Sequence, residues 1–222
     1  MFYISLGPNC HIAGALNDMN LRCFSLPFDF LLNNMGLKYI ANLVDNNFAD
    51  FLNNLTYNKI NNKEIVISEN YPNVLFFHHD LIKNKQNLVK SLKIDHKNMD
   101  ELLIEKFKRR GHRFMNIISD SSQKCMFFYI LEEIYITNKI LLISLIDQIS
   151  FLKNIMYNKF KCTYKLIIFI IVNNNEELLE EIICDLNKNY KNIVFEPFFG
   201  GNNKHDNEQN ISRCINKYSK YF

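Results

Sequence analysis

The sequence predicts a three-layer α/β fold, Rossmann-like or esterase-like, in which helices cover both faces of a mostly parallel sheet. Apolar runs such as Lys165 to Val172 lack the alternation of a half-exposed strand and are typical of strands buried on both faces. Segments with the helical spacing of apolar residues separate these runs, as they do in βαβ units. The 222 residues, 48% of them hydrophobic, suffice for one domain with a large core, and we expect a single domain over 1–222.

The predicted strands are short runs of β-branched and aromatic residues that end at turn signals. The first ends at Gly7-Pro8, and we expect a helix to begin near Pro8-Asn9-Cys10 with Asn9 as its cap. A further strand, Glu64 to Ser68, is joined to the second strand of the sheet by the turn Asn70-Tyr71-Pro72. The strands expected in the parallel sheet are Phe2–Leu6, Asn73–Phe77, Cys125–Ile130, Lys165–Val172 and Asn192–Phe195.

The remaining predicted helices show apolar residues three and four positions apart. In the segment 99–118, for example, Leu103, Phe107 and Phe114 fall on one face, with Gly111 as the weak point of the helix. The other helices are expected at about 37–55, 140–158 and 176–188. Together they supply the two outer layers.

The charge balance argues against a nucleic-acid partner. With 26 Lys and Arg against 23 Asp and Glu, the net charge of +3 is too small and too dispersed for a phosphate-binding face. The basic run from Lys108 to Arg113 is interpreted as a solvated helix face, with an anion site as the alternative. Charge and composition do not fix an oligomeric state.

The cysteine pattern indicates reduced thiols rather than disulfides or metal ligands. The 6 cysteines lie far apart, and none forms a C-x-x-C pair, so we expect no metal and no cofactor. The N-terminal segment lacks the features of a secretory signal, and no apolar stretch reaches the roughly 18 residues of a membrane span. We therefore expect a cytoplasmic protein. The many Asn, Lys and Ile residues suggest an AT-rich genome such as that of a large DNA virus, in which case the compartment is the host cytoplasm.

Candidate site residues follow the predicted strands, because ligands of α/β sheets bind beyond the carboxyl ends of the strands. Cys10 is expected in the first turn of a helix, where free N–H groups and the helix dipole favour a thiolate. That position makes it a candidate nucleophile. The competing interpretation is that Cys10 is a small buried hydrophobic residue, as we expect of the other five cysteines.

A histidine pair follows the predicted strand Asn73 to Phe77. His78, His79 and Asp80 together provide an imidazole that takes a thiol proton and a carboxylate that orients it. Adjacent strand residues point to opposite faces, so only one of the two histidines is expected to reach Cys10, and a shared metal is disfavoured. His205, beside Asp206 near the C-terminus, is an alternative base.

Three short motifs resemble one known family. The segments SLGPNC (Ser5 to Cys10), PFDF (Pro27 to Phe30) and FFHHD (Phe76 to Asp80) are similar, in order and spacing, to the papain-like cysteine peptidase family long known as a domain of unknown function. The resemblance implies that Cys10 is the nucleophile and that His79, with Asp80 beside it, is the base, leaving His78 as an alternative. Phe30 stands where the family pattern has tryptophan. The family label also implies a papain-like α+β fold as the alternative to the parallel sheet.

The leading functional hypothesis is a cysteine hydrolase that forms an acyl-enzyme with a peptide or another acyl substrate. The residues expected to bind this substrate are Asn9, Pro27, Phe28, Asp29 and Phe30. Two alternatives remain open at this stage. One is a non-catalytic α/β module that binds a glycan or a protein through the PFDF segment, and the other is a glycan-modifying enzyme.

Overall fold

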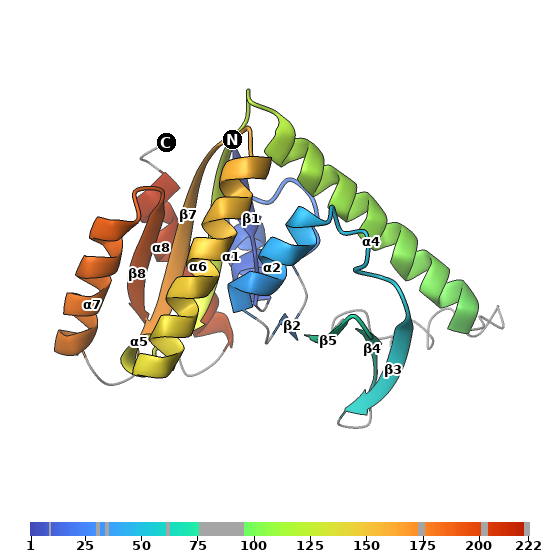
Figure 1. Ribbon diagram of the computed structural model, residues 1–222, viewed down its shortest axis with the longest axis horizontal. Helices are drawn as coiled ribbons and strands as arrows, with labels where there is room; N and C mark the ends of the chain where they lie inside the picture. The colour runs from blue at the N-terminus through green and yellow to red at the C-terminus, as the bar shows by residue number, and fades with distance from the viewer. Residues whose placement is uncertain are drawn as a thin grey trace.

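A four-stranded parallel sheet forms the centre of the computed structural model, which describes residues 1–8, 10–29, 32–33, 36–60, 63–75, 96–172, 176–200 and 204–219. The strand order is β1-β6-β7-β8, and every neighbouring pair is parallel (Figure 1). These strands are β1 (Phe2–Ser5), β6 (Lys124–Glu132), β7 (Thr163–Val172) and β8 (Ile193–Phe199). The expected parallel sheet is therefore confirmed.

Helices cover both faces of this sheet, which confirms the predicted α/β class. One face carries α2 (Gly36–Asp45), α4 (His96–Ser119), α6 (Lys139–Lys159) and α7 (Glu176–Asn189). The other face carries α1 (His11–Asp18) and α8 (Lys204–Ser219). The short helix α5 (Ile134–Thr137) follows β6 directly and leads into α6 (Figure 1).

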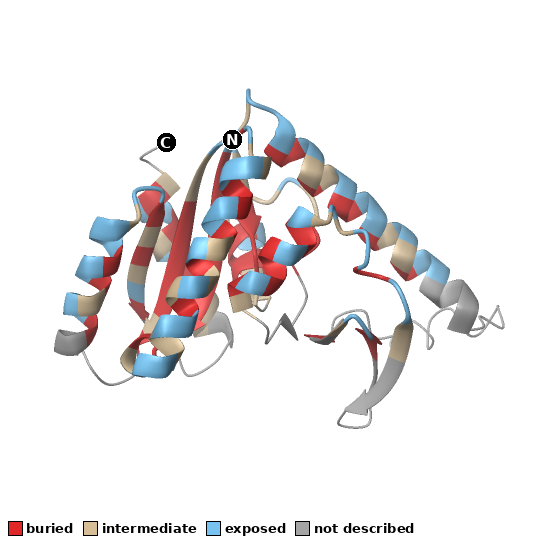
Figure 2. Ribbon diagram, viewed as in Figure 1, coloured by how far each residue is buried: buried red, intermediate tan, exposed pale blue. Residues whose placement is uncertain are grey.

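Two separate hydrophobic cores explain why the sheet strands lack an apolar/polar alternation. In β6, Phe127 and Tyr129 pack in the core under the four-helix face, whereas Met126 and Phe128 pack against α1 and α8. Both sets are buried, and the central strands are buried along most of their length (Figure 2). Alternate residues of a strand point to opposite faces, so a strand buried on both sides must be apolar throughout.

The predicted strand Asn73 to Phe77 was wrongly assigned to the parallel sheet. Its described part belongs to β5, which lies in a second, antiparallel sheet of order β2-β5-β4-β3. Only Glu69 and Asn70 separate β4 from β5, and so short a connection joins antiparallel strands, because a parallel pair needs a long crossover. The strands of this sheet are β2 (Leu32–Asn33), β3 (Leu55–Ile60), β4 (Lys63–Ser68) and β5 (Tyr71–Leu75).

Two helix predictions also differ from the structure. The helix expected over 37–55 ends at Asp45, and the chain then turns through Asn47 and Phe48, both with positive φ. The C-terminal helix α8 was absent from the predicted elements, although Ile211 and Ile215 are spaced one turn apart and are fully buried. The polar composition of the rest of α8 hides this apolar stripe.

Helix α6 is the one helix of the described residues that is long and apolar enough to cross a membrane. Such a helix is weak evidence for a span, because core helices of soluble proteins pass the same test. One side of α6 does pack in the core, through Leu145, Ile149 and Leu152. The expected absence of a membrane span stays a prediction.

Candidate functional site

Cys10 lies at the start of α1, immediately beyond the carboxyl end of β1. The chain leaves β1 through Leu6, whose N–H donates to the carbonyl of Phe128, and turns at Gly7, whose φ of 92° suits a residue without Cβ. Cys10 is the N-cap residue of α1, and its carbonyl accepts the first helical hydrogen bond, from Gly14 at 2.8 Å. The thiol is half-buried. The helix therefore begins one position later than predicted, at His11, and Asn9 lies outside the described residues.

The first turns of α1 and α8 lie side by side at this edge of the sheet. Both helices follow parallel strands and pack on the same face, so both begin at the carboxyl ends of those strands. The Glu208 carboxylate of α8 sits so close to Gly14 of α1 that a Cβ at Gly14 would be 2.1 Å from Glu208 Oε1. Glu208 lies one turn after His205, and Gly14 lies one turn after Cys10. The backbone of His205 is therefore placed near the start of α1.

The histidine pair of the FFHHD motif is the predicted source of the base. His78, His79 and Asp80 lie outside the described residues, so the pairing of His79 with Cys10 stays a prediction. One premise behind it is corrected: these residues follow β5, which belongs to the antiparallel sheet and not to the parallel sheet that carries Cys10. Of His205, the structure describes only the backbone, which belongs to α8.

Asp29 of the PFDF motif is the centre of a buried ion pair. Its Oδ2 accepts hydrogen bonds from Nε and Nη2 of Arg22, at 3.1 and 2.9 Å, and from the backbone N–H of Leu26 at 2.7 Å. The exposed fractions of the Arg22 and Asp29 side chains are 13% and 3%. Burial raises the pKa of Asp29, while the nearby Arg22 charge and the Leu26 N–H act in the opposite direction. The carboxylate thus closes the loop from Arg22 to Asp29.

Phe28 of the same motif is a core residue. Its ring is 2% exposed and makes an edge-to-face contact with Phe114 of α4, with the ring centroids 5.6 Å apart. A second ring, Phe48, packs on it at 5.7 Å. Pro27 is also buried, and Phe30 lies outside the described residues. The described part of the motif anchors a loop in the core, and its proposed contact with substrate stays a prediction.

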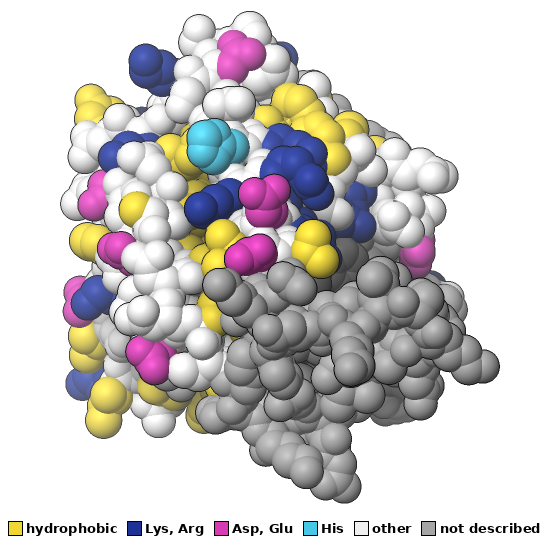
Figure 3. Space-filling view, turned by 90° about the vertical axis from the view of Figure 1, so that its right-hand side faces the viewer, with side chains coloured by type: hydrophobic (Ala, Val, Ile, Leu, Met, Phe, Trp, Pro, Cys, Tyr) yellow, Lys and Arg dark blue, Asp and Glu magenta, His cyan; other side chains and the backbone are white. Residues whose placement is uncertain are grey.

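The basic residues of α4 fall into two groups, one exposed and one turned inward. Lys108, Arg109 and His112 are exposed, and acidic side chains lie among the Lys and Arg side chains on this face of the molecule (Figure 3). Arg110 and Arg113 instead turn toward the PFDF loop. This mixture of charges agrees with a solvated outer face.

The two inward arginines support the Arg22–Asp29 loop. Arg113 Nη1 donates to the carbonyl of Ser25 at 3.0 Å, and its guanidinium stacks 4.8 Å from the centre of the Phe24 ring. Arg110 is 7% exposed and stacks over Phe107. Burial lowers the pKa of Arg110, and the opposing attraction comes from Asp29. No sequence pattern marked Arg22 as the partner of Asp29, which follows it by seven positions.

The six thiols differ in burial, and this difference bears on which of them can react. Cys125 and Cys162 are buried, and the hydrogen bond between them, in which the Cys125 thiol is the donor, together with burial raises the pKa of Cys125. Burial and the nearby Glu196 raise the pKa of Cys214 to about 11. Cys10 is half-buried at a helix start, and Cys23 and Cys184 are exposed. Within the described part of the chain, no three His, Cys, Asp or Glu side chains gather as a metal site would need.

A comparison with family models decides the family. The model described as "Putative papain-like cysteine peptidase (DUF1796)" matches residues 1–176. The chain belongs to this family. The matched region includes Cys10, the PFDF motif and His79, and it ends before α8. No curated protein and no solved structure matches the chain. The family description agrees with the coarser expectation of a cysteine hydrolase.

Proposed function

We propose that the protein is a cysteine hydrolase in which Cys10 is the nucleophile. The observation that carries the proposal is the position of Cys10, half-buried at the N-cap of α1 and at the carboxyl edge of the parallel sheet, in a chain of a cysteine peptidase family. The substrate is a peptide or another acyl compound.

The chemistry follows from a thiol at a helix start. The Cys10 sulfur attacks the acyl carbon while an imidazole holds the thiol proton, and the tetrahedral oxyanion is stabilised by backbone N–H groups at the start of α1. The bond to the leaving group then breaks, and the imidazolium gives its proton to that group. Water, deprotonated by the same imidazole, hydrolyses the thioester and restores the thiol.

His79 is the proposed base, with Asp80 orienting its ring. Support comes from the family match, which contains His79 together with Cys10. His205 is the alternative, and its support is the packing of α8 against α1, which brings the first turns of these helices together. The two candidate bases follow different sheets: His205 follows β8 of the parallel sheet, whereas His79 follows β5 of the antiparallel sheet.

Single substitutions separate these roles. Turnover of an activated ester and of fluorogenic peptides is measured for Cys10→Ala, His79→Ala and His205→Ala, with His112→Ala on the exposed face of α4 as the matched control. Cys10→Ala abolishes turnover, and removal of the base reduces it by roughly 100-fold, the usual contribution of a positioned proton acceptor. His112→Ala leaves it unchanged. Turnover that persists in Cys10→Ala contradicts the proposal, and a loss in His205→Ala but not in His79→Ala moves the base to α8.

A further inference from the structure

A pocket of about 310 Å³ lies at the opposite edge of the sheet from Cys10. Its lining comes from the start of β7, the start of β8, the connection between α7 and β8, and the facing side of α6. Cys10 follows the carboxyl end of β1, whereas Tyr164 and Ile193 lie at the amino ends of β7 and β8. The pocket is therefore separate from the proposed catalytic site. Its volume is within the range of small-molecule sites, at the lower end of roughly 300 to 1,000 Å³.

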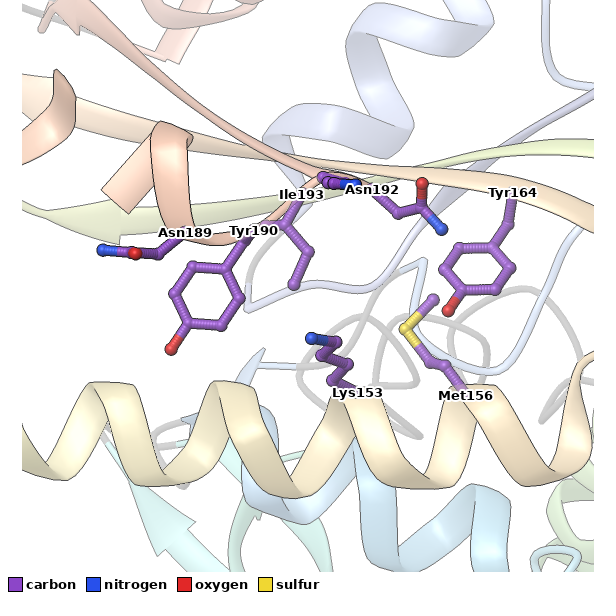
Figure 4. Close-up of a pocket in the computed structure, with 8 residues that line it drawn as sticks. Lys153, Met156, Tyr164, Asn189, Tyr190, Asn192 and Ile193 are labelled. Atoms are coloured by element: carbon purple, nitrogen blue, oxygen red, sulfur yellow. The ribbon is translucent and has the colours of Figure 1, made fainter. Parts of the chain in front are cut away.

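Two tyrosine rings form its side walls, and packing holds both of them in place. Tyr164 makes an edge-to-face contact with Phe160 at 5.5 Å between ring centroids, and Tyr190 packs on Phe195 at 6.2 Å. Figure 4 shows the two rings on either side of Lys153 and Met156, which rise from α6 between them. Rings held in this way present fixed faces to a ligand at little cost in conformational entropy.

The loop that forms the roof of the pocket is also fixed. The carbonyl of Asn192 accepts a hydrogen bond of 2.9 Å from Leu166 of β7. The Asn187 side chain bonds both the N–H and the carbonyl of Phe195, at 2.8 and 3.1 Å. The pocket thus exists without rearrangement of its backbone.

The polar groups of the lining select a ligand chemistry. Lys153 and Lys191 contribute two positive charges, and no carboxylate occurs among the described residues that line the pocket. The Lys153 ammonium lies 5.7 Å from the centre of the Tyr190 ring, at the junction between charge and aromatic surface. The amides of Asn189 and Asn192 are each hydrogen-bonded already, to the Asp185 carbonyl at 2.9 Å and to Tyr164. Their remaining amide groups can bond the edge of a heteroaromatic base.

We propose that this pocket binds a nucleoside monophosphate, that is, a heteroaromatic ring linked to a phosphate. The ring packs against Tyr164 and Tyr190, the amide groups of Asn189 and Asn192 that are not bonded to Asp185 and Tyr164 contact its edge, and the phosphate pairs with Lys153 and Lys191. Aromatic stacking and charge-assisted hydrogen bonds are the interactions by which proteins hold such ligands. The pocket lies outside the proposed hydrolase chemistry, and the proposal does not depend on it.

Isothermal titration calorimetry of the full chain tests the proposal with AMP, UMP, adenosine and inorganic phosphate. We expect saturable binding of at least one nucleotide at one site per chain, with adenosine and phosphate alone each weaker by about tenfold or more, since each lacks half of the contacts. Lys153→Met weakens nucleotide binding by about tenfold, the effect of losing one charge-assisted hydrogen bond. Lys188→Met, an exposed lysine of α7 outside the pocket, is the matched control and leaves binding unchanged.

Three results would overturn this assignment. The first is the absence of saturable binding of both nucleotides. The second is equal weakening by Lys153→Met and Lys188→Met, which would indicate general attraction to positive charge. The third is equal affinity for adenosine and AMP, which would show that the phosphate contributes nothing to binding. Both lysines are exposed, so the variants keep the fold and these outcomes remain measurable.

Discussion

Removal of the Asp29 carboxylate is expected to destabilise the protein strongly. In Asp29→Ala the buried Arg22 guanidinium and the Leu26 N–H lose their common acceptor. Breaking a buried ion pair by removal of one partner costs about 3 to 5 kcal/mol, and an orphaned buried donor adds to that loss. Because the Arg22 side chain is 13% exposed, we expect the lower end of this range, about 3 kcal/mol. This is a large share of the roughly 5 to 15 kcal/mol that holds a domain folded.

Urea unfolding followed by far-ultraviolet circular dichroism measures this change, and the signal needs no tryptophan, which the chain lacks. Asp185→Ala is the control, because its ion pair with Lys188 has both side chains about two-thirds exposed. Such an exposed pair contributes roughly 0 to 1 kcal/mol. A loss below about 1 kcal/mol for Asp29→Ala would refute the structural role. Wild-type stability combined with lost turnover would instead assign the carboxylate to substrate binding.

Two further predictions concern the helix contact and a second thiol. Gly14→Ala should lower the free energy of unfolding because its methyl group displaces the Glu208 carboxylate. In a Glu208→Ala background the same change should stabilise α1 by about 1 kcal/mol, because alanine has the higher helix propensity. Additive effects in a double-mutant cycle, measured by urea unfolding, would contradict the contact. Cys214, with its pKa raised to about 11, should carry only about one thiolate in a thousand at pH 8 and should react with iodoacetamide far more slowly than exposed Cys23, gaining reactivity as the pH rises toward 11. Quantitative mass spectrometry across pH checks this order, and equal rates at pH 8 would contradict the burial of Cys214.

The parallel sheet could be predicted because its strands are buried on both faces. The continuous apolar runs around Phe127 and Phe169 are typical of strands buried on both faces, so sequence alone identified all four strands of this sheet. The strand at Val74 was misassigned for the same reason: Val74 is buried in an apolar run, but an apolar run does not reveal which sheet it joins. The short turn before Tyr71 was the available signal for an antiparallel pair.

The site was only partly predictable. The position of Cys10 at a strand-to-helix turn followed from Gly7-Pro8 and the helical spacing after it. The neighbours of Cys10 could not be predicted in this way, because α8 carries only a thin apolar stripe in a polar segment. The contact of Glu208 in α8 with Gly14 also joins residues almost two hundred positions apart. Gly14, which has no side chain of its own, is the local feature that lets another element approach there.

Acylation of Cys10 is the most direct measurement of the central claim. The full chain is mixed with an activated acetyl ester at pH 6.5 and quenched in acid within seconds, and the acetylated cysteines are mapped by peptide mass spectrometry. The account predicts one acetyl group on Cys10, faster than on the exposed Cys23 and Cys184, and its turnover to free enzyme on longer incubation. Equal acetylation of Cys10, Cys23 and Cys184, with no return of free thiol, would contradict the account and leave Cys10 as a structural residue of α1.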